Sequence, residues 1–186
     1  DEIVLDDALF ARIETVYRQR EALDLDAESV RLVEETWKYF VRAGARLDGA
    51  EKQRLRELNG KLAELQTKFR QNVLAEVNDL AIVVEDEAEL AGLTATQIRT
   101  AADEAASRGM EGSYVIPLLN TSQQPPLASL ENRGLRQRIL ETSLSRGHRG
   151  SEYDNRAPLA EAARLRAERA RLLGYEQRGV GPVIVR

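Results

Sequence analysis

Apolar residues recur at intervals of three and four along most of the chain, which is the spacing of helices that bury one face. The first such segment covers residues 6–21, and a second follows Asp26, whose carboxylate can cap a helix, and ends near Gly44. Asp48 and Glu51 have the spacing of a capping box at the start of the longest helix. That helix carries a 3-4-3-4 apolar seam at Leu55, Leu58, Leu62, Leu65 and Phe69. Since only a short turn separates the second and third helices, we expect them to pair antiparallel within a bundle.

The period then changes to that of a small β ribbon. Residues 80–84 are compact and β-branched, and residues 113–119 form a second strand candidate whose Pro117 restricts it to an edge. Thr94 opens an alanine-rich helix between them. Two further helices are predicted, with caps at Asn132 and Asn155. The pattern therefore predicts a mainly α protein, a helical hairpin or bundle of about five to six helices with a two-stranded ribbon.

Composition and charge support a helical chain and weaken some functions. Charged residues make up 31% of the 186 residues and aromatic residues 5%, which suits long exposed helices in one domain with at most a small appendage. Residues 1–112 contain 15 basic and 24 acidic side chains, a net charge of −9, and residues 113–186 contain 12 and 7, a net charge of +5. We interpret this asymmetry as attraction between the two parts or toward a neighbouring domain, with an anion-binding surface as the alternative.

Hydrolytic chemistry has few candidate residues in this sequence. The chain has one histidine, His148, and no cysteine. His148 lies between Arg146 and Arg149 without a nucleophilic serine motif, so we interpret it as a solvent-exposed bystander. A zinc site of the H-E-x-x-H type needs two histidines on one helix face. We therefore assign no catalytic, cofactor-binding or metal-binding residue to this chain.

Three segments with charged or glycine-rich composition are candidate binding sites. The acidic residues Glu85, Asp86, Glu87 and Glu89 could hold calcium or magnesium, but they lack the alternation of an EF-hand loop and fit an acidic turn better. Residues 147–150 are too short for a phosphate-binding loop. The last helix carries Arg164, Arg166, Arg169 and Arg171 beside Glu161 and Glu168, which favours a solvated, ion-paired face over a nucleic-acid surface.

The sequence carries few signals that bear on the cellular location of the protein. No apolar run approaches the roughly 18 residues of a membrane span, and no signal peptide opens the chain. We expect no membrane partner and a cytoplasmic location, with the bacterial periplasm as an alternative.

Several segments together resemble one protein family. They are LVEETWKYFVRAG at 32–44, LNGKLAELQTKFRQNVLAE at 58–76, ELAGL at 89–93, QPPL at 124–127, Asn132-Arg133, and LRAERARLLGY at 165–175. Their order and spacing are similar to the region ahead of the catalytic domain in the thimet oligopeptidase, oligopeptidase A and peptidyl-dipeptidase family of zinc metallopeptidases, the gluzincins. The peptidyl-dipeptidase branch is the most similar. Each motif alone is weak, and the specificity lies in their combination.

The resemblance implies a helical wall around the channel in which family members cut short peptides. The family's zinc ligands lie downstream, and none matches a position here. Gly134 departs from the family as a helix-weakening residue. The resemblance covers residues 2–175. Residues 176–186 form a divergent tail, interpreted as a truncated or frameshifted gene end, a product of cloning, or a strand.

Two functions follow as hypotheses. The leading one is a non-catalytic fragment of such a peptidase, 1–175, whose partner is the missing catalytic domain and whose peptide substrate binds only in the full enzyme. Its exposed apolar faces would self-associate, most readily through the alanine-rich helix and the edge strand. The alternative is a stand-alone helical interaction or adaptor protein derived from such a peptidase. An active enzyme with other chemistry is disfavoured by the residue inventory.

Overall fold

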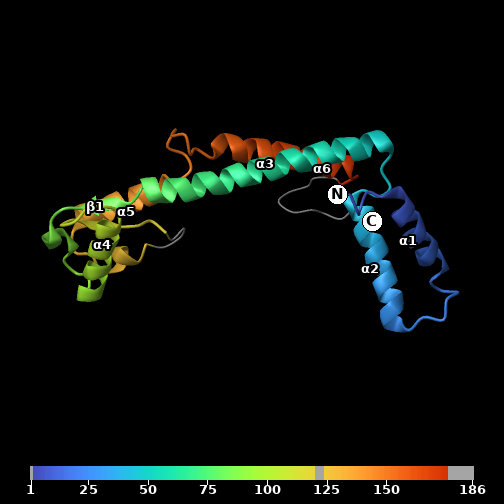
Figure 1. The fold of residues 1–186 in the computed structure, drawn as a ribbon, viewed down its shortest axis with the longest axis horizontal. Helices are drawn as coiled ribbons and strands as arrows, with labels where there is room; N and C mark the ends of the chain where they lie inside the picture. The colour runs from blue at the N-terminus through green and yellow to red at the C-terminus, as the bar shows by residue number, and fades with distance from the viewer. Residues whose placement is uncertain (1, 120–123, 176–186) are drawn as a thin grey trace. The chain divides into compact units, whose positions relative to one another are not determined.

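The computed structural model describes residues 2–119 and 124–175 of the chain (Figure 1). The chain divides into two compact units, one formed by residues up to 66 together with those from 160 onward, and the other by residues 67–159. Over the described residues there are six α-helices and one two-stranded sheet, which confirms the predicted fold class. In chain order the elements are α1 (Asp7–Gln19), α2 (Ala27–Ala43), α3 (Gly49–Asp79), β1 (Ile82–Val84), η1 (Glu87–Leu90), α4 (Ala95–Ser107), β2 (Tyr114–Ile116), η2 (Pro125–Ala128), α5 (Arg133–Leu144) and α6 (Arg156–Leu172).

The predicted ends of the second and third helices are confirmed by their hydrogen bonds. Asp26 Oδ1 accepts from the Ser29 amide at 2.7 Å, and Gly44 ends α2 with a left-handed φ of 103°. The Asp48 carboxylate accepts from the Glu51 amide at 2.8 Å, while Glu51 accepts from the Asp48 amide at 3.0 Å. These reciprocal bonds form the predicted capping box. A second such box opens α4.

The cap of α2 has a predictable pH dependence. Hydrogen bonds from Ser29 hold the pKa of Asp26 below its ordinary value of 3.8. Because the folded-state pKa is the lower one, this stabilisation is present above the unfolded pKa and is lost as pH falls through the folded one. Asp26→Asn keeps the acceptor but cannot titrate. We expect the variant to lose less helicity than the native chain between about pH 5 and pH 2.5, measured by far-UV circular dichroism. Identical acid profiles would contradict this account of the cap.

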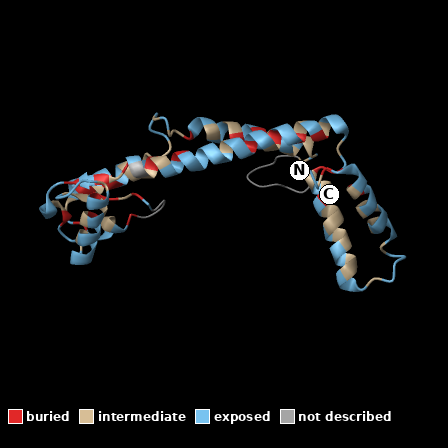
Figure 2. Cartoon of the chain, viewed as in Figure 1, coloured by how far each residue is buried: buried red, intermediate tan, exposed pale blue. Residues whose placement is uncertain are grey.

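The first unit contains a hairpin, but not the one that we predicted. α2 packs along α1, where Phe10 stacks on Phe40 and Tyr17 on Trp37 with ring centroids 6.4 and 4.1 Å apart. The apolar seam of α3 is instead buried against α6, and Figure 2 marks its buried residues in red. This cluster consists of Leu58, Leu62, Ala162 and Leu165. The expected antiparallel pairing of α2 with α3 was therefore wrong, because apolar spacing defines the buried face of a helix and not its partner.

The second unit is organised around the small sheet. β1 and β2 are antiparallel in the register Ile82↔Ile116, Val83↔Val115 and Val84↔Tyr114. Within residues 2–119 and 124–175, β2 pairs with a strand on one side only, in agreement with the edge position predicted from Pro117. α4 packs on β2 and buries Ala101 and Ala105, so this face of the alanine-rich helix is covered within the unit. A core of Leu80, Ile82, Val84, Leu90, Ile116, Leu118, Leu130, Leu135 and Ile139 joins the sheet to α5.

None of the described helices has both the length and the apolarity needed to span a membrane.

Candidate functional site

The loop that carries His148 is fastened to α3 by a buried carboxylate. Glu76 is only 2% exposed, and its Oε2 accepts from the Gly147 amide at 2.6 Å. Its Oε1 lies 3.4 Å from Nε of Arg149, and the same guanidinium is 2.7 Å from Asp79 Oδ2. Glu76 thus satisfies a backbone donor and a cation together, which is how a buried carboxylate is stabilised. These ion pairs also join acidic residues of the first part of the chain to a basic residue of the second, in line with the charge asymmetry.

A pair of asparagines fastens the other end of the loop. Asn72, 2% exposed, donates from Nδ2 to Asn155 Oδ1 at 3.0 Å, and Asn155 Nδ2 donates to the carbonyl of Phe69 at 3.3 Å. The Asn155 backbone amide donates to the Gly147 carbonyl at 2.8 Å, closing the loop. Residues 147–155 are therefore held at both ends by one face of α3.

The predicted cap of the last helix needs a correction. Asn155 precedes α6, but its side chain is occupied by α3 and does not cap the helix. Asp154 instead accepts from the Arg156 amide at 2.9 Å. The Arg156 guanidinium and this amide hold the pKa of Asp154 well below its ordinary value. Tertiary hydrogen bonds to Asn72 and Phe69 have displaced the local capping role of Asn155.

A cleft of about 440 Å³ lies beside this loop. Its apolar wall comes from Phe69, Val73, Val77 and Leu159, and its polar wall from Glu76, Ser143, Arg146, Gly147, His148, Asn155 and Arg156. Arg146 donates to the Leu118 carbonyl at 2.7 Å, so this guanidinium is partly engaged within the unit. His148 is exposed, as predicted, with Nδ1 3.3 Å from the Arg146 carbonyl oxygen. Such a cleft can hold an apolar side chain, but it offers no paired nucleophile and base.

The acidic segment before α4 serves local structure. Asp86 accepts from the Ala88 amide at 2.9 Å and starts η1, while Glu89 accepts from Asn132 at 3.3 Å. Glu87 accepts from the hydroxyl of Tyr114, and this bond raises the pKa of the tyrosine. Among the described residues, no three acidic, histidine or cysteine side chains come together as metal ligands. The interpretation as an acidic turn fits this geometry.

Of the four arginines expected to form an ion-paired face on α6, Arg164 makes such pairs, with Glu161 and Glu168. Arg164 lies 2.6 Å from Glu161, and Arg54 of α3 donates from Nε to Glu168 at 2.9 Å. Arg169 donates to Asn59 at 3.2 Å. The phosphate-loop candidate at 147–150 is likewise occupied, since its Gly147 amide binds Glu76 and its Gly150 amide donates to Asp154 at 2.8 Å.

The important residues that sequence reasoning missed lie on the C-terminal half of α3. Asn72, Glu76 and Asp79 recur at intervals of four and three, which is the spacing of one helix face. A polar stripe that continues an apolar seam was the available signal. This signal is weak, because polar residues of a helix are usually solvated.

Comparison with known proteins gives this scaffold a context. No family model matches the chain. It is 40% identical over 175 residues to the dipeptidyl carboxypeptidase of Escherichia coli, covering 94% of this chain and 26% of that protein. The dipeptidyl carboxypeptidase of Salmonella typhimurium is 41% identical with the same coverage. Oligopeptidase A of Haemophilus influenzae is 31% identical over 83% of this chain and 23% of its own length.

The chain therefore matches one segment of the oligopeptidase A and dipeptidyl carboxypeptidase family of peptidases, which confirms the resemblance carried by its motifs. Within that family its sequence is more similar to the two dipeptidyl carboxypeptidases than to this oligopeptidase A. It spans about a quarter of the length of these relatives.

Proposed function

We propose that this chain is a non-catalytic, helical part of a zinc-dependent oligopeptidase of the dipeptidyl carboxypeptidase type, and that it forms part of the wall of the substrate channel. The observation that carries the proposal is the match of 94% of the chain to only 26% of a dipeptidyl carboxypeptidase. In this proposal residues 1–175 are the helical part and residues 176–186 a divergent tail. The partner is the catalytic part of the enzyme, and the substrate is an oligopeptide held between the two.

The donor atoms of this chain do not fit the zinc that the family implies. The sequence has one histidine and no cysteine, and the described residues gather no set of three ligands. We therefore assign no step through zinc to this chain. Its contribution is positional, through loop 147–155, which is held on α3 by Glu76 and Asn72.

Features of the cleft beside this loop support a role in contacting peptide. It sets apolar side chains from α3 and α6 opposite polar groups from the loop. An extended peptide presents apolar side chains together with backbone donors and acceptors, so a wall of mixed polarity suits it. Transition-state chemistry would be supplied by groups outside this chain.

A peptidase assay tests the proposal. The chain alone should give no zinc-dependent release of dipeptides from a short peptide. Mixed with the rest of the Escherichia coli dipeptidyl carboxypeptidase, expressed as a separate polypeptide that lacks the matched segment, it should restore turnover that chelation abolishes. The E. coli segment itself is the positive control. Chelator-sensitive cleavage by the chain alone, retained through a second purification, would overturn the non-catalytic assignment.

We also propose a cytoplasmic location, supported by the similarity to a plant protein named as a probable cytosolic oligopeptidase A, 32% identical over 78% of this chain.

A further inference from the structure

On one side of the α1–α2 hairpin, charged side chains form ion pairs and cover aromatic rings. Glu14 binds Arg46 at 3.1 Å and Arg20 binds Glu34 at 3.2 Å. The two guanidiniums also lie over aromatic rings, Arg20 at 4.3 Å from the centroid of Tyr17 and Arg46 at 4.9 Å from that of Trp37. Because Tyr17 and Trp37 are themselves stacked at 4.1 Å, these side chains form a four-layer stack with a cation at each end.

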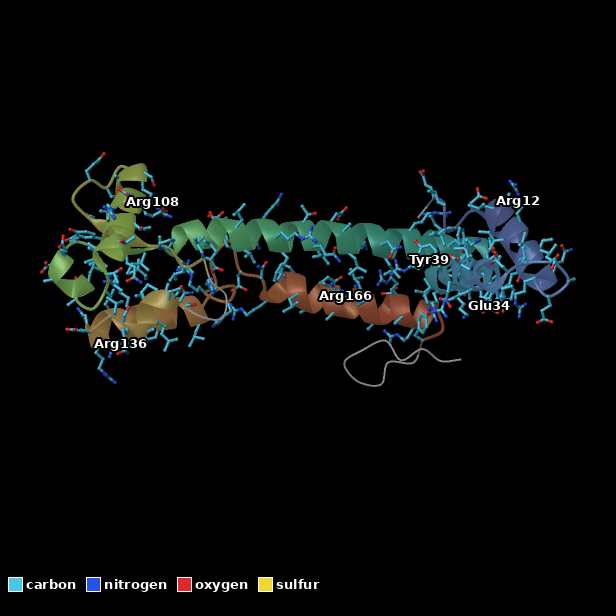
Figure 3. All side chains as sticks on the ribbon, turned by 90° about the horizontal axis from the view of Figure 1, so that it is seen from below. Arg12, Glu34, Tyr39, Arg108, Arg136 and Arg166 are labelled. Carbon is cyan, nitrogen blue, oxygen red and sulfur yellow. The ribbon has the colours of Figure 1, made fainter. Side chains whose placement is uncertain are left out.

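The other side of the hairpin is an apolar groove of about 410 Å³. It is lined by Leu9, Arg12, Ile13, Val16, Leu32, Val33 and Thr36. Leu32 of α2 is 67% exposed and Val16 of α1 is 42% exposed, although both side chains are apolar. Figure 3 shows Arg12 and Glu34 on opposite sides of the hairpin. Helical spacing agrees for the two acidic residues, since Glu14 and Glu34 fall on faces of their helices that differ from those of the groove residues.

We propose that this groove receives an amphipathic helix from the part of the peptidase that lies outside this chain. The inference rests on the proposed function, because about three quarters of the length of the relatives is not represented here. A groove between two antiparallel helices matches the apolar ridge of a third helix. Leu32 and Val16 of the groove remain exposed, so this side of the hairpin presents apolar surface that a partner helix can cover.

Arg12 indicates the chemistry of the incoming helix. It is the one charged residue among the groove residues, and it has no hydrogen-bond or ion-pair partner in the described part of the chain. An acidic residue beside the apolar ridge of the incoming helix would pair with it. A second copy of this chain fits less well, because a two-fold interface places the same patch on both partners and would bring Arg12 onto an apolar surface or onto its own copy.

The absence of cysteine makes a direct test possible. Leu32→Cys and Thr15→Cys each introduce one thiol on the hairpin, the first in the groove and the second at an exposed position of α1 outside it. Each is labelled with an environment-sensitive fluorophore and titrated with the E. coli remainder described above. We expect a blue shift for the label at position 32 and no shift at position 15. In unlabelled protein, Leu32→Glu should weaken binding by about tenfold or more, while Thr15→Glu should change it less than about twofold.

The outcomes separate this inference from the proposed function. If the remainder binds the native chain and Leu32→Glu binds equally well, the groove is not the contact and the inference fails while the proposed function stands. If the remainder does not bind the native chain but does bind the E. coli segment, the partnership itself fails. If the label at position 32 shifts with chain concentration alone, a second copy occupies the groove and the inference is overturned.

Discussion

Replacing Gly92 by alanine is expected to destabilise the second unit by about 3 kcal/mol. Gly92 follows η1 with a φ of +94°, a conformation that costs an L-residue roughly 1–2 kcal/mol. A Cβ at this position would lie 2.0 Å from the carbonyl oxygen of Ser129. That carbonyl is difficult to move, because the neighbouring Glu131 amide is bonded to the carbonyl of Ala91 at 2.8 Å. The backbone strain of an alanine at this φ and the overlap of its Cβ with the Ser129 carbonyl oxygen therefore both destabilise the variant.

Gly60 provides a matched control for this substitution. It lies at an exposed position inside α3, and a Cβ there would meet nothing within 4 Å. Gly60→Ala should raise the free energy of unfolding by roughly 0.5–1 kcal/mol, since glycine is a poor helix residue. Urea unfolding followed by circular dichroism would measure both variants, with amide exchange in β1 and α5 reporting on Gly92→Ala and exchange in the first half of α3 reporting on Gly60→Ala. A Gly92→Ala chain that is as stable as the native one would show that the approach of residue 92 to Ser129 is not a constraint.

Replacing Glu76 by alanine should cost about 2–3 kcal/mol and release loop 147–155 from α3. The substitution leaves the Gly147 amide without its acceptor and removes one of the two carboxylates beside Arg149. We place the effect below the full cost of breaking a buried ion pair because the Arg149 side chain is 31% exposed and keeps Asp79.

Two further variants separate the parts of this effect. Glu76→Gln retains an oxygen that can accept from Gly147 and should recover roughly half of the lost stability. Glu64→Ala, at an exposed position of the same helix, should stay within about 0.5 kcal/mol of the native chain. The measurement is urea unfolding together with amide exchange at Gly147. We expect the Gly147 amide to exchange fast in Glu76→Ala and slowly in Glu76→Gln. Equal protection in both would remove Glu76 from its proposed role.

Local features of the fold were accessible from the sequence. Asp26, Asp48 and Thr94 were identified as caps because a capping side chain bonds backbone only three residues away. The two strands were found because β-branched runs interrupt the helical period, and Pro117 placed the second strand at an edge. These features depend on residues that are close together in the chain, so a single sequence is enough to predict them.

Choices of tertiary partner were not accessible. The turn after α2 gave no sign that Trp37 would stack on Tyr17 of α1 in preference to a residue of α3. Asn155 had the local chemistry of a cap, but its side chain bonds to Asn72, 83 residues earlier in the chain. Glu76 has the appearance of a solvated helix residue until Gly147 and Arg149 are placed against it. In each case the contact joins segments that are far apart in the sequence, and no local pattern shows that they are close in the fold.

The candidate sites likewise include one feature that the sequence predicts and one that it does not. The inventory of one histidine and no cysteine was enough to predict that this chain supplies no zinc site, and that prediction awaits the peptidase assay. The groove of the α1–α2 hairpin could not be predicted, because Val16 has the apolar spacing of the first helix, whose face was expected to be buried, and it is 42% exposed.

The most direct test of the central claim is to sequence the coding DNA on both sides of this chain. If the chain is part of a dipeptidyl carboxypeptidase-type enzyme, the reading frame continues beyond Arg186 into a segment that contains H-E-x-x-H. A start codon directly before Asp1 together with a stop codon directly after Arg186 would contradict that account and favour a stand-alone helical protein.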